Sequence, residues 1–144
     1  MKTLHFSTRI HAPRERVWQL MLAPDSYREW TTAFCEGSYY VGSWEQGHRM
    51  RFRSPEGQGM FSEIAEYRPH EFISIRHLGE LSNGIEEKGV ASQWANAREN
   101  YTFSRDGAAT LLQVDVDTVP EFETYMTEAW PKALARLKEL CEVR

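Results

Sequence analysis

Residues 110–141 read TLLQVDVDTVPEFETYMTEAWPKALARLKELC, and a change of pattern within them decides the fold. Over residues 110–119, apolar Leu112, Val114 and Val116 alternate with polar side chains. This period of two is typical of a β-strand with one buried face. We therefore expect a strand that leads directly into the long segment after it.

That following segment has the pattern of a helix. Thr118, Val119, Pro120 and Glu121 form a capping-box signature, which predicts that the helix begins here. Its apolar stripe is Phe122, Met126, Ala129, Trp130, Ala133, Leu134, Leu137, Leu140 and Cys141. Pro131 falls inside it, so the helix either kinks at this point or consists of two pieces.

The chain before residue 110 contains a first strand, two short helices and a series of further strands. Alternation over residues 3–11 predicts the first strand, and Pro13 and Pro24 then open short helices. Further strands are predicted at residues 39–44, 48–53, 59–67, 72–78 and 98–104, separated by short turns. Short connections make neighbouring strands antiparallel, so the expected class is α+β with about six to seven strands.

Composition narrows the type of protein. The 144 residues fit a single domain spanning 1–144, and 12% of them are aromatic, which hints at a ring-lined pocket. The net charge of −4 argues against a nucleic-acid partner. We expect no membrane partner and a cytoplasmic location, because no apolar run is long enough to span a bilayer and no signal peptide begins the chain. Cys35 and Cys141 are then expected to be reduced thiols.

The chain resembles the helix-grip proteins of the START/SRPBCC superfamily, which includes the birch-pollen-allergen-like folds. It most resembles the branch named after the C-terminal domain of heat shock protein 90 ATPase activators. The resemblance rests on IHAPRERVW at 10–18, YREW at 27–30, GSW at 42–44, GMFSEI at 59–64 with Pro69, and Trp130-Pro131. It implies a curved antiparallel sheet wrapped around the last helix, with a cavity between them.

Strand alternation then predicts which side chains line that cavity. His48, Met50 and Phe52 share one inward face, and we expect Phe61 and Glu63 to face inward from the next strand. The predicted ligand-binding residues are Trp30, His48, Met50, Phe52, Phe61, Glu63, Ile73, His77, Trp94, Tyr101, Met126 and Trp130. A mostly apolar site with few polar groups is typical of small-molecule pockets.

The polar members of this set have three interpretations. His48, His77 and Glu63 could form a two-histidine, one-carboxylate metal site, although they lie on separate strands. They could act as a general acid and base on a bound ligand. They could also be ordinary hydrogen-bonded side chains, the interpretation that we prefer, so we predict no catalytic residue, no metal and no cofactor. Glu99 is expected to reach this region only if its strand bulges.

The preferred function is a binding module for a small hydrophobic or aromatic molecule. The first alternative is a cyclase- or hydrolase-like enzyme that uses His77, His48 and Glu63, and the second is a chaperone-associated interaction module. Phosphate-binding loops and hydrolase motifs are absent from the sequence. Residues 79–97 form a long stretch in which Trp94 would seal the cavity if it folds over the mouth. An exposed edge strand beside this stretch could pair two subunits in a homodimer.

Overall fold

The alternating strand at the end of the sheet-forming region lies where its pattern predicts, between two antiparallel neighbours. The computed structural model describes residues 1–87 and 93–143. In it, β8 (Ala109–Thr118) pairs with β1 (Lys2–Ile10) on one side and with β7 (Arg98–Asp106) on the other. The strand order in the sheet is β1-β8-β7-β5-β4-β3-β2, and every pairing is antiparallel. The inward residues of β8 are fully buried, as expected from their period of two.

The remaining elements follow the predicted order with small changes at their ends. The other strands are β2 (Tyr39–Gly42), β3 (Arg49–Arg53), β4 (Gly59–Arg68), β5 (Phe72–Ser82) and the two-residue β6 (Ile85–Glu86). The helical elements are α1 (Arg14–Leu22), α2 (Pro24–Trp30), η1 (Thr31–Ala33), η2 (Pro120–Phe122) and α3 (Glu123–Glu142). Strand β5 is longer than predicted, because its pairing with β4 continues to Leu81.

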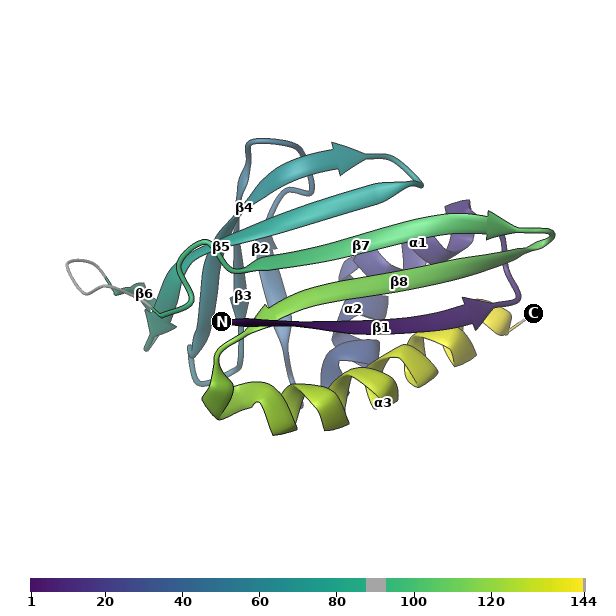
Figure 1. Cartoon of the computed structure of the whole chain (residues 1–144). Coiled ribbons are helices and arrows are strands. Elements are labelled where there is room, and N and C mark those ends of the chain that lie inside the picture. Colours follow the sequence, from purple (N-terminus) through teal and green to yellow (C-terminus); the bar gives the residue numbers. More distant parts are fainter. Residues whose placement is uncertain (88–92, 144) are drawn as a thin grey trace.

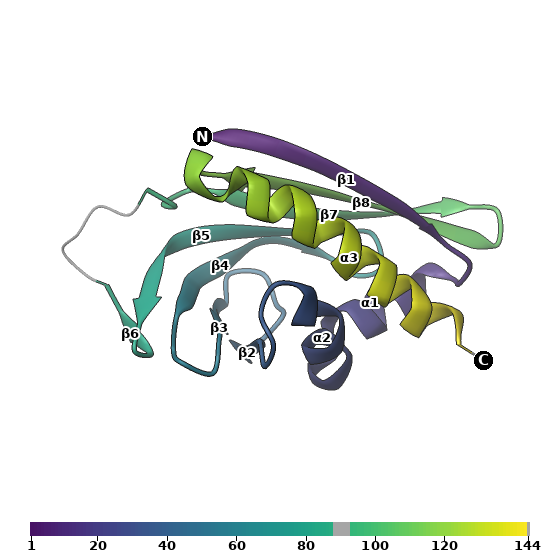
Figure 2. The same cartoon turned by 90° about the horizontal axis from the view of Figure 1, so that it is seen from below.

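The sheet curves around the last helix. Figure 1 shows the long strands β1, β8 and β7 running above α3, and Figure 2 shows α3 crossing that face of the sheet from below. Helices α1 and α2 lie on the side of α3 that faces away from β1, beside the C-terminal half of α3. No helix within the described part of the chain is long and apolar enough to cross a membrane.

Two local predictions about α3 need correction. The Thr118 hydroxyl donates to the Val119 carbonyl rather than capping the helix, and a turn of 3-10 helix comes before Glu123. The prediction of a capping box is therefore wrong, since Pro120 sets the chain direction before the α-helix begins. The sequence allowed either a kink at Pro131 or two separate helical pieces. The structure has one continuous helix through this residue, so the two-piece alternative is excluded.

Strands β1 and β2 lie at the two ends of the strand order. The two-residue β6 lies within residues 79–97, and among the described residues it pairs with β5 alone, so it is a short edge strand. A homodimer formed through such an edge stays a prediction.

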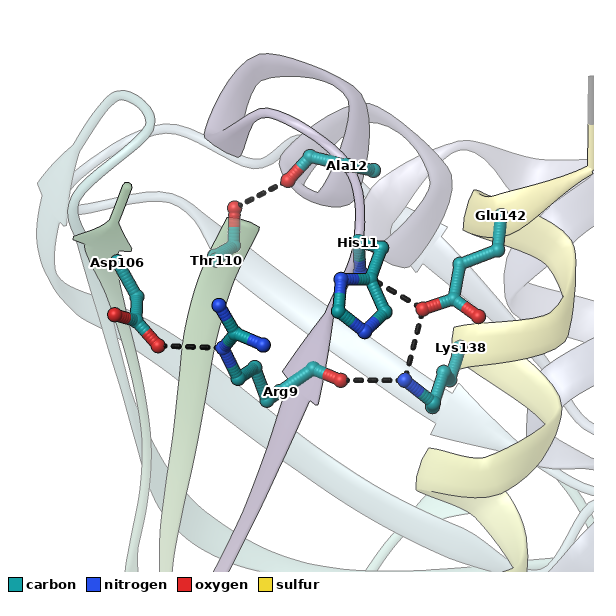
Figure 3. Close-up of polar contacts among 7 residues, drawn as sticks. All are labelled: Arg9, His11, Ala12, Asp106, Thr110, Lys138 and Glu142. Carbon is teal, nitrogen blue, oxygen red and sulfur yellow. Dashed lines mark hydrogen bonds and ion pairs between the residues drawn. The ribbon is translucent and has the colours of Figure 1, made fainter. Parts of the chain in front are cut away.

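The C-terminal end of α3 is fixed to the end of β1 by polar contacts (Figure 3). The Lys138 ammonium donates to the Arg9 carbonyl at 2.6 Å and to Glu142 Oε2 at 2.8 Å. The same carboxylate oxygen accepts the backbone N–H of His11 at 2.8 Å. Donation by Lys138, together with that backbone N–H, lowers the pKa of Glu142 below its ordinary value. The carboxylate thus joins the last turn of the helix to the strand–helix junction.

We predict that Glu142→Gln lowers the melting temperature near neutral pH by a small amount, on the order of 2 °C. A carboxyl whose pKa is lowered by folding stabilises the folded state above its unfolded-state pKa, and this contribution is lost as the pH falls through its folded-state pKa. The difference between variant and wild type should therefore close on acidification. Thermal unfolding followed by circular dichroism at several pH values measures this.

Glu139→Gln is the matched control, because Glu139 forms its ion pair within the described residues with Arg136 of the same helix. Its loss removes the same charge from α3 without touching β1. A Glu142→Gln deficit that persists unchanged in acid would contradict the assigned role of the carboxylate.

Candidate functional site

A cavity of about 760 Å³ lies between the sheet and the helices. Ten of the described lining residues have aromatic rings: Tyr27, Trp30, Phe34, Tyr39, Phe52, Trp94, Tyr101, Phe122, Tyr125 and Trp130. Helical elements α2, η2 and α3, with the residue after η1, supply six of these rings, and strands β2, β3 and β7 supply three. This volume lies within the roughly 300–1,000 Å³ range of small-molecule pockets.

Trp130 joins the walls of this cavity. Its ring lies 6.1 Å from the Phe6 ring of β1 and 6.0 Å from the Trp30 ring of α2, measured between centroids. It meets Phe34 edge-on at 4.9 Å and Tyr101 at 6.1 Å. Trp130 is only 3% exposed. One side chain of α3 therefore sets how far the helices stand from the strands.

A chain of polar side chains crosses the cavity wall from β4 to β7. Ser62 Oγ lies 2.7 Å from His77 Nδ1, and His77 Nε2 lies 3.3 Å from Glu99 Oε1. The Tyr101 hydroxyl donates to the other oxygen of Glu99. Because a carboxylate only accepts, Nε2 carries the hydrogen that faces it, and Nδ1 of the neutral ring accepts from Ser62. His77, Glu99 and Tyr101 all line the cavity.

Burial makes the phenols of this wall poor acids. It raises the pKa of Tyr101 well above its ordinary value, and the adjacent Glu99 adds to the rise. Burial also raises the pKa of Tyr27, and Glu99 again contributes. Both hydroxyls therefore stay protonated around neutral pH, and Tyr101 acts as a fixed hydrogen-bond donor to Glu99.

The predicted site residues fall into three groups. The cavity is lined by Trp30, Phe52, His77, Trp94, Tyr101, Met126 and Trp130. Met50 and Ile73 are buried in the core without reaching the cavity wall. His48, Phe61 and Glu63 lie elsewhere, so the structure does not bring all twelve residues together.

His48 and Glu63 have partners of their own outside the cavity. His48 precedes β3 at the surface, with its Nε2 3.3 Å from Glu45 Oε2. Glu63 forms an ion pair with Arg76 of β5 at 2.9 Å. The combination of His48, Glu63 and His77, considered above for metal binding or acid–base chemistry, is therefore not assembled. Within residues 1–87 and 93–143, no three His, Cys, Asp or Glu side chains are placed to hold a metal ion.

Strand β4 has the opposite phase from the one predicted. Ser62 pairs with inward-facing Met50 and Met60 pairs with Phe52, so residues 60 and 62 face inward. Phe61 and Glu63 consequently share the outer face with Arg51 and Arg49, their pairing partners. The Phe61 ring also lies over Gly79, where a Cβ would come within 2.6 Å of it. The expectation that Phe61 and Glu63 face inward is thus wrong.

Glu99 and Arg53 also line the cavity, and neither is among the predicted site residues. Glu99 lies two residues before Tyr101 on β7, and residues so spaced share a face without any bulge. That spacing was the signal that could have identified it. Arg53 ends β3, and its guanidinium lies 5.7 Å from the Tyr39 ring centroid.

Trp94 is part of the cavity wall. It is 7% exposed and packs against Phe122 with 5.6 Å between ring centroids. Ala97, Val119, Met60 and Met126 complete this small cluster. Part of the stretch expected to cover the mouth, residues 88–92, lies outside the described residues.

The polar chain can position a ligand more readily than it can react with one. Ser62 is completely buried, so its hydroxyl has no access to a substrate as a nucleophile. Both nitrogens of His77 already face polar partners. Glu99 retains acceptor capacity toward the cavity, since a carboxylate has about four lone-pair positions and the contacts with His77 and Tyr101 occupy two of them.

Comparison with known proteins agrees with this architecture. The family described as Activator of Hsp90 ATPase homolog 1-like protein matches residues 11–142. The chain belongs to this family. A search of curated proteins gave no match.

Solved structures of similar proteins share the fold at low sequence identity. The Aha1 dimer from Colwellia psychrerythraea has a TM-score of 0.76 at 16% identity, covering 99% of this chain and 98% of that one. Protein MLL2253 from Mesorhizobium loti has a TM-score of 0.74 at 16% identity, covering 96% of each chain. CalU16 from Micromonospora echinospora has 0.68 at 17%, covering 97% of this chain and 76% of that one. At these identities the likeness shows the shared fold alone.

We predict that Tyr27→Phe and Tyr101→Phe leave the ultraviolet titration of the folded protein unchanged between about pH 8 and about pH 10.5. Both phenols have raised pKa values because they are buried, so neither ionises in this range while the protein is folded. Absorbance of tyrosinate is the measurement. In guanidinium each variant should lose the amplitude of one tyrosine. A matching loss in the folded state would contradict the assignment.

Proposed function

We propose that this protein is a small-molecule binding module whose ligand is an apolar or aromatic molecule held between the sheet and α3. The observation that carries the proposal is the ring-lined cavity of about 760 Å³ with one polar chain in its wall. Stacking on these rings would supply affinity through buried apolar surface. The polar chain of His77, Glu99 and Tyr101 would orient the ligand.

Binding without chemistry accounts for the polar chain better than catalysis does. To take a proton from a substrate, His77 would have to exchange one of its two ring contacts, with Ser62 or with Glu99, for a contact with that substrate. The rings around these groups instead provide a preformed apolar site. Ligand binding is therefore the function that we test first.

Cys35 provides a built-in reporter, because it is exposed and lines the cavity. We predict that a bound aromatic ligand at about ten times its Kd slows modification of Cys35 by up to about tenfold. Cys141 does not interfere, since burial raises its pKa to about 12. Reaction with a chromogenic disulfide measures the rate, and Cys35→Ser identifies its contribution.

Thermal unfolding with the same compounds gives an independent reading. A ligand at about 100 times its Kd should stabilise the fold by roughly 2.7 kcal/mol. Met126→Trp should abolish the stabilisation, because the larger ring fills the cavity from α3. The matched control is Thr124→Trp, which adds the same ring at an exposed position near the start of that helix. If no compound protects Cys35 or raises Tm, the proposal fails and an interaction with a protein partner is favoured.

A further inference from the structure

The wall of the cavity has an uneven distribution of charge. Strands β5, β7 and β8 contribute Glu80, Glu99 and Asp117 to it. No lysine or arginine on these strands is among the described residues that line the cavity. A wall with one sign of charge and low-dielectric surroundings concentrates a field of that sign in the enclosed space. The acidic side of this cavity is therefore suited to a positive group.

Arg53 is the arginine among the described lining residues, and its guanidinium lies beside Gly84, where a Cβ would come within 2.5 Å of Nη2. It ends β3, and its guanidinium rests over the ring of Tyr39 on β2. Glu56 lines the cavity from the turn that follows β3. Within the described part of the chain, the partners of the Glu99 carboxylate are the His77 ring and the Tyr101 hydroxyl, not an arginine or lysine.

Glu99 is the acidic group with the most suitable surroundings for a ligand. Its side chain is 23% exposed, so it is partly withdrawn from solvent yet reachable from the cavity. Asp117 also accepts one hydrogen bond on each oxygen, from the Thr3 hydroxyl and the backbone N–H of Arg98, but both of these contacts lie at the exposed surface. Glu99 can accept a further hydrogen bond, and bonds between charged partners are about twice as strong as neutral ones.

The rings beside Glu99 favour the same kind of ligand group. The Glu99 charge contributes to the raised pKa values of Tyr27 and Tyr101. The Phe52 ring lies 6.5 Å from the His77 ring. A cation is attracted to the faces of aromatic rings, and this attraction strengthens when the cation is desolvated. A carboxylate acceptor inside an aromatic box thus combines two independent attractions for one positive charge.

We propose that the ligand carries a protonated amine on its apolar or aromatic body, and that Glu99 accepts a hydrogen bond from this amine inside the cavity. The inference rests on the proposed binding function and specifies the ligand class. The amine would occupy the β5–β7–β8 side, while the apolar body stacks among the rings of α2 and α3. An anionic ligand group would face repulsion from the same carboxylates.

The test compares three naphthalene derivatives of similar size by isothermal titration calorimetry near neutral pH. Naphthylmethylamine carries the positive charge, naphthalenemethanol is neutral and naphthoate is negative. We expect the amine to bind about tenfold more tightly than the alcohol, which corresponds to one charge-assisted hydrogen bond. The carboxylate should bind most weakly.

Glu99→Gln should remove most of the amine's advantage while affinity for the alcohol stays nearly the same. Gln keeps an acceptor for Tyr101, so the cavity should persist, and protection of Cys35 by the alcohol checks this. Glu63→Gln is the matched control, because it removes the same charge from the outer face, where Glu63 pairs with Arg76. An equal effect in both variants would assign the preference to net charge alone and overturn the inference.

The outcomes separate this inference from the proposed function. Equal affinity of the amine and the alcohol for the wild type overturns the amine inference and leaves the binding function intact. An amine preference that Glu99→Gln does not reduce also overturns it. If none of the three compounds binds or protects Cys35, the binding function fails and the inference fails with it.

Discussion

The packing of Trp130 against rings from four other segments is the constraint on which the rest of the structure depends. Phe6 and Tyr101 belong to the sheet, while Trp30 and Phe34 belong to the helical side. A large rigid ring at this crossing keeps α3 at a defined distance from the strands, because aromatic pairs prefer centroid separations of about 4.5–7 Å. The space beside the ring is the cavity. Core packing and cavity formation are thus two results of the same contact.

Strand register decides which polar groups this space contains. Continuous pairing of β3 with β4 puts Ser62 on the inner face, where it meets His77 of β5. Pairing of β5 with β7 then sets Glu99 beside Ile75 and within reach of the histidine. A shift of one residue in either pairing would move these side chains to opposite faces. The polar chain therefore depends on how three strands pair, including the register shift between Phe61 and Ser62 in the pairing of β4 with β5.

The order of strands and helices along the chain could be predicted from the sequence. Which face of each strand is buried could not be predicted for every strand. The apolar residues of β8 all fall on one parity, so its buried face could be predicted. In β4 the two parities are nearly equivalent, since Met60 and Ile64 stand on one and Phe61 on the other. Only the pairing with Met50 and Phe52 selects between them, and no local pattern contains that pairing. Glu99, by contrast, was predictable from its spacing to Tyr101.

The position of Glu99 conflicts with the ring-lined wall around it. Taking an acidic side chain partly out of water costs free energy, which hydrogen bonds must offset. Tyr101 supplies one such bond, and the His77 ring, held by Ser62, supplies the second contact. A stable core would need none of these groups, because apolar residues of the same size would pack there at lower cost. Polar groups that weaken a core while keeping one another in place are typical of a site shaped for a ligand.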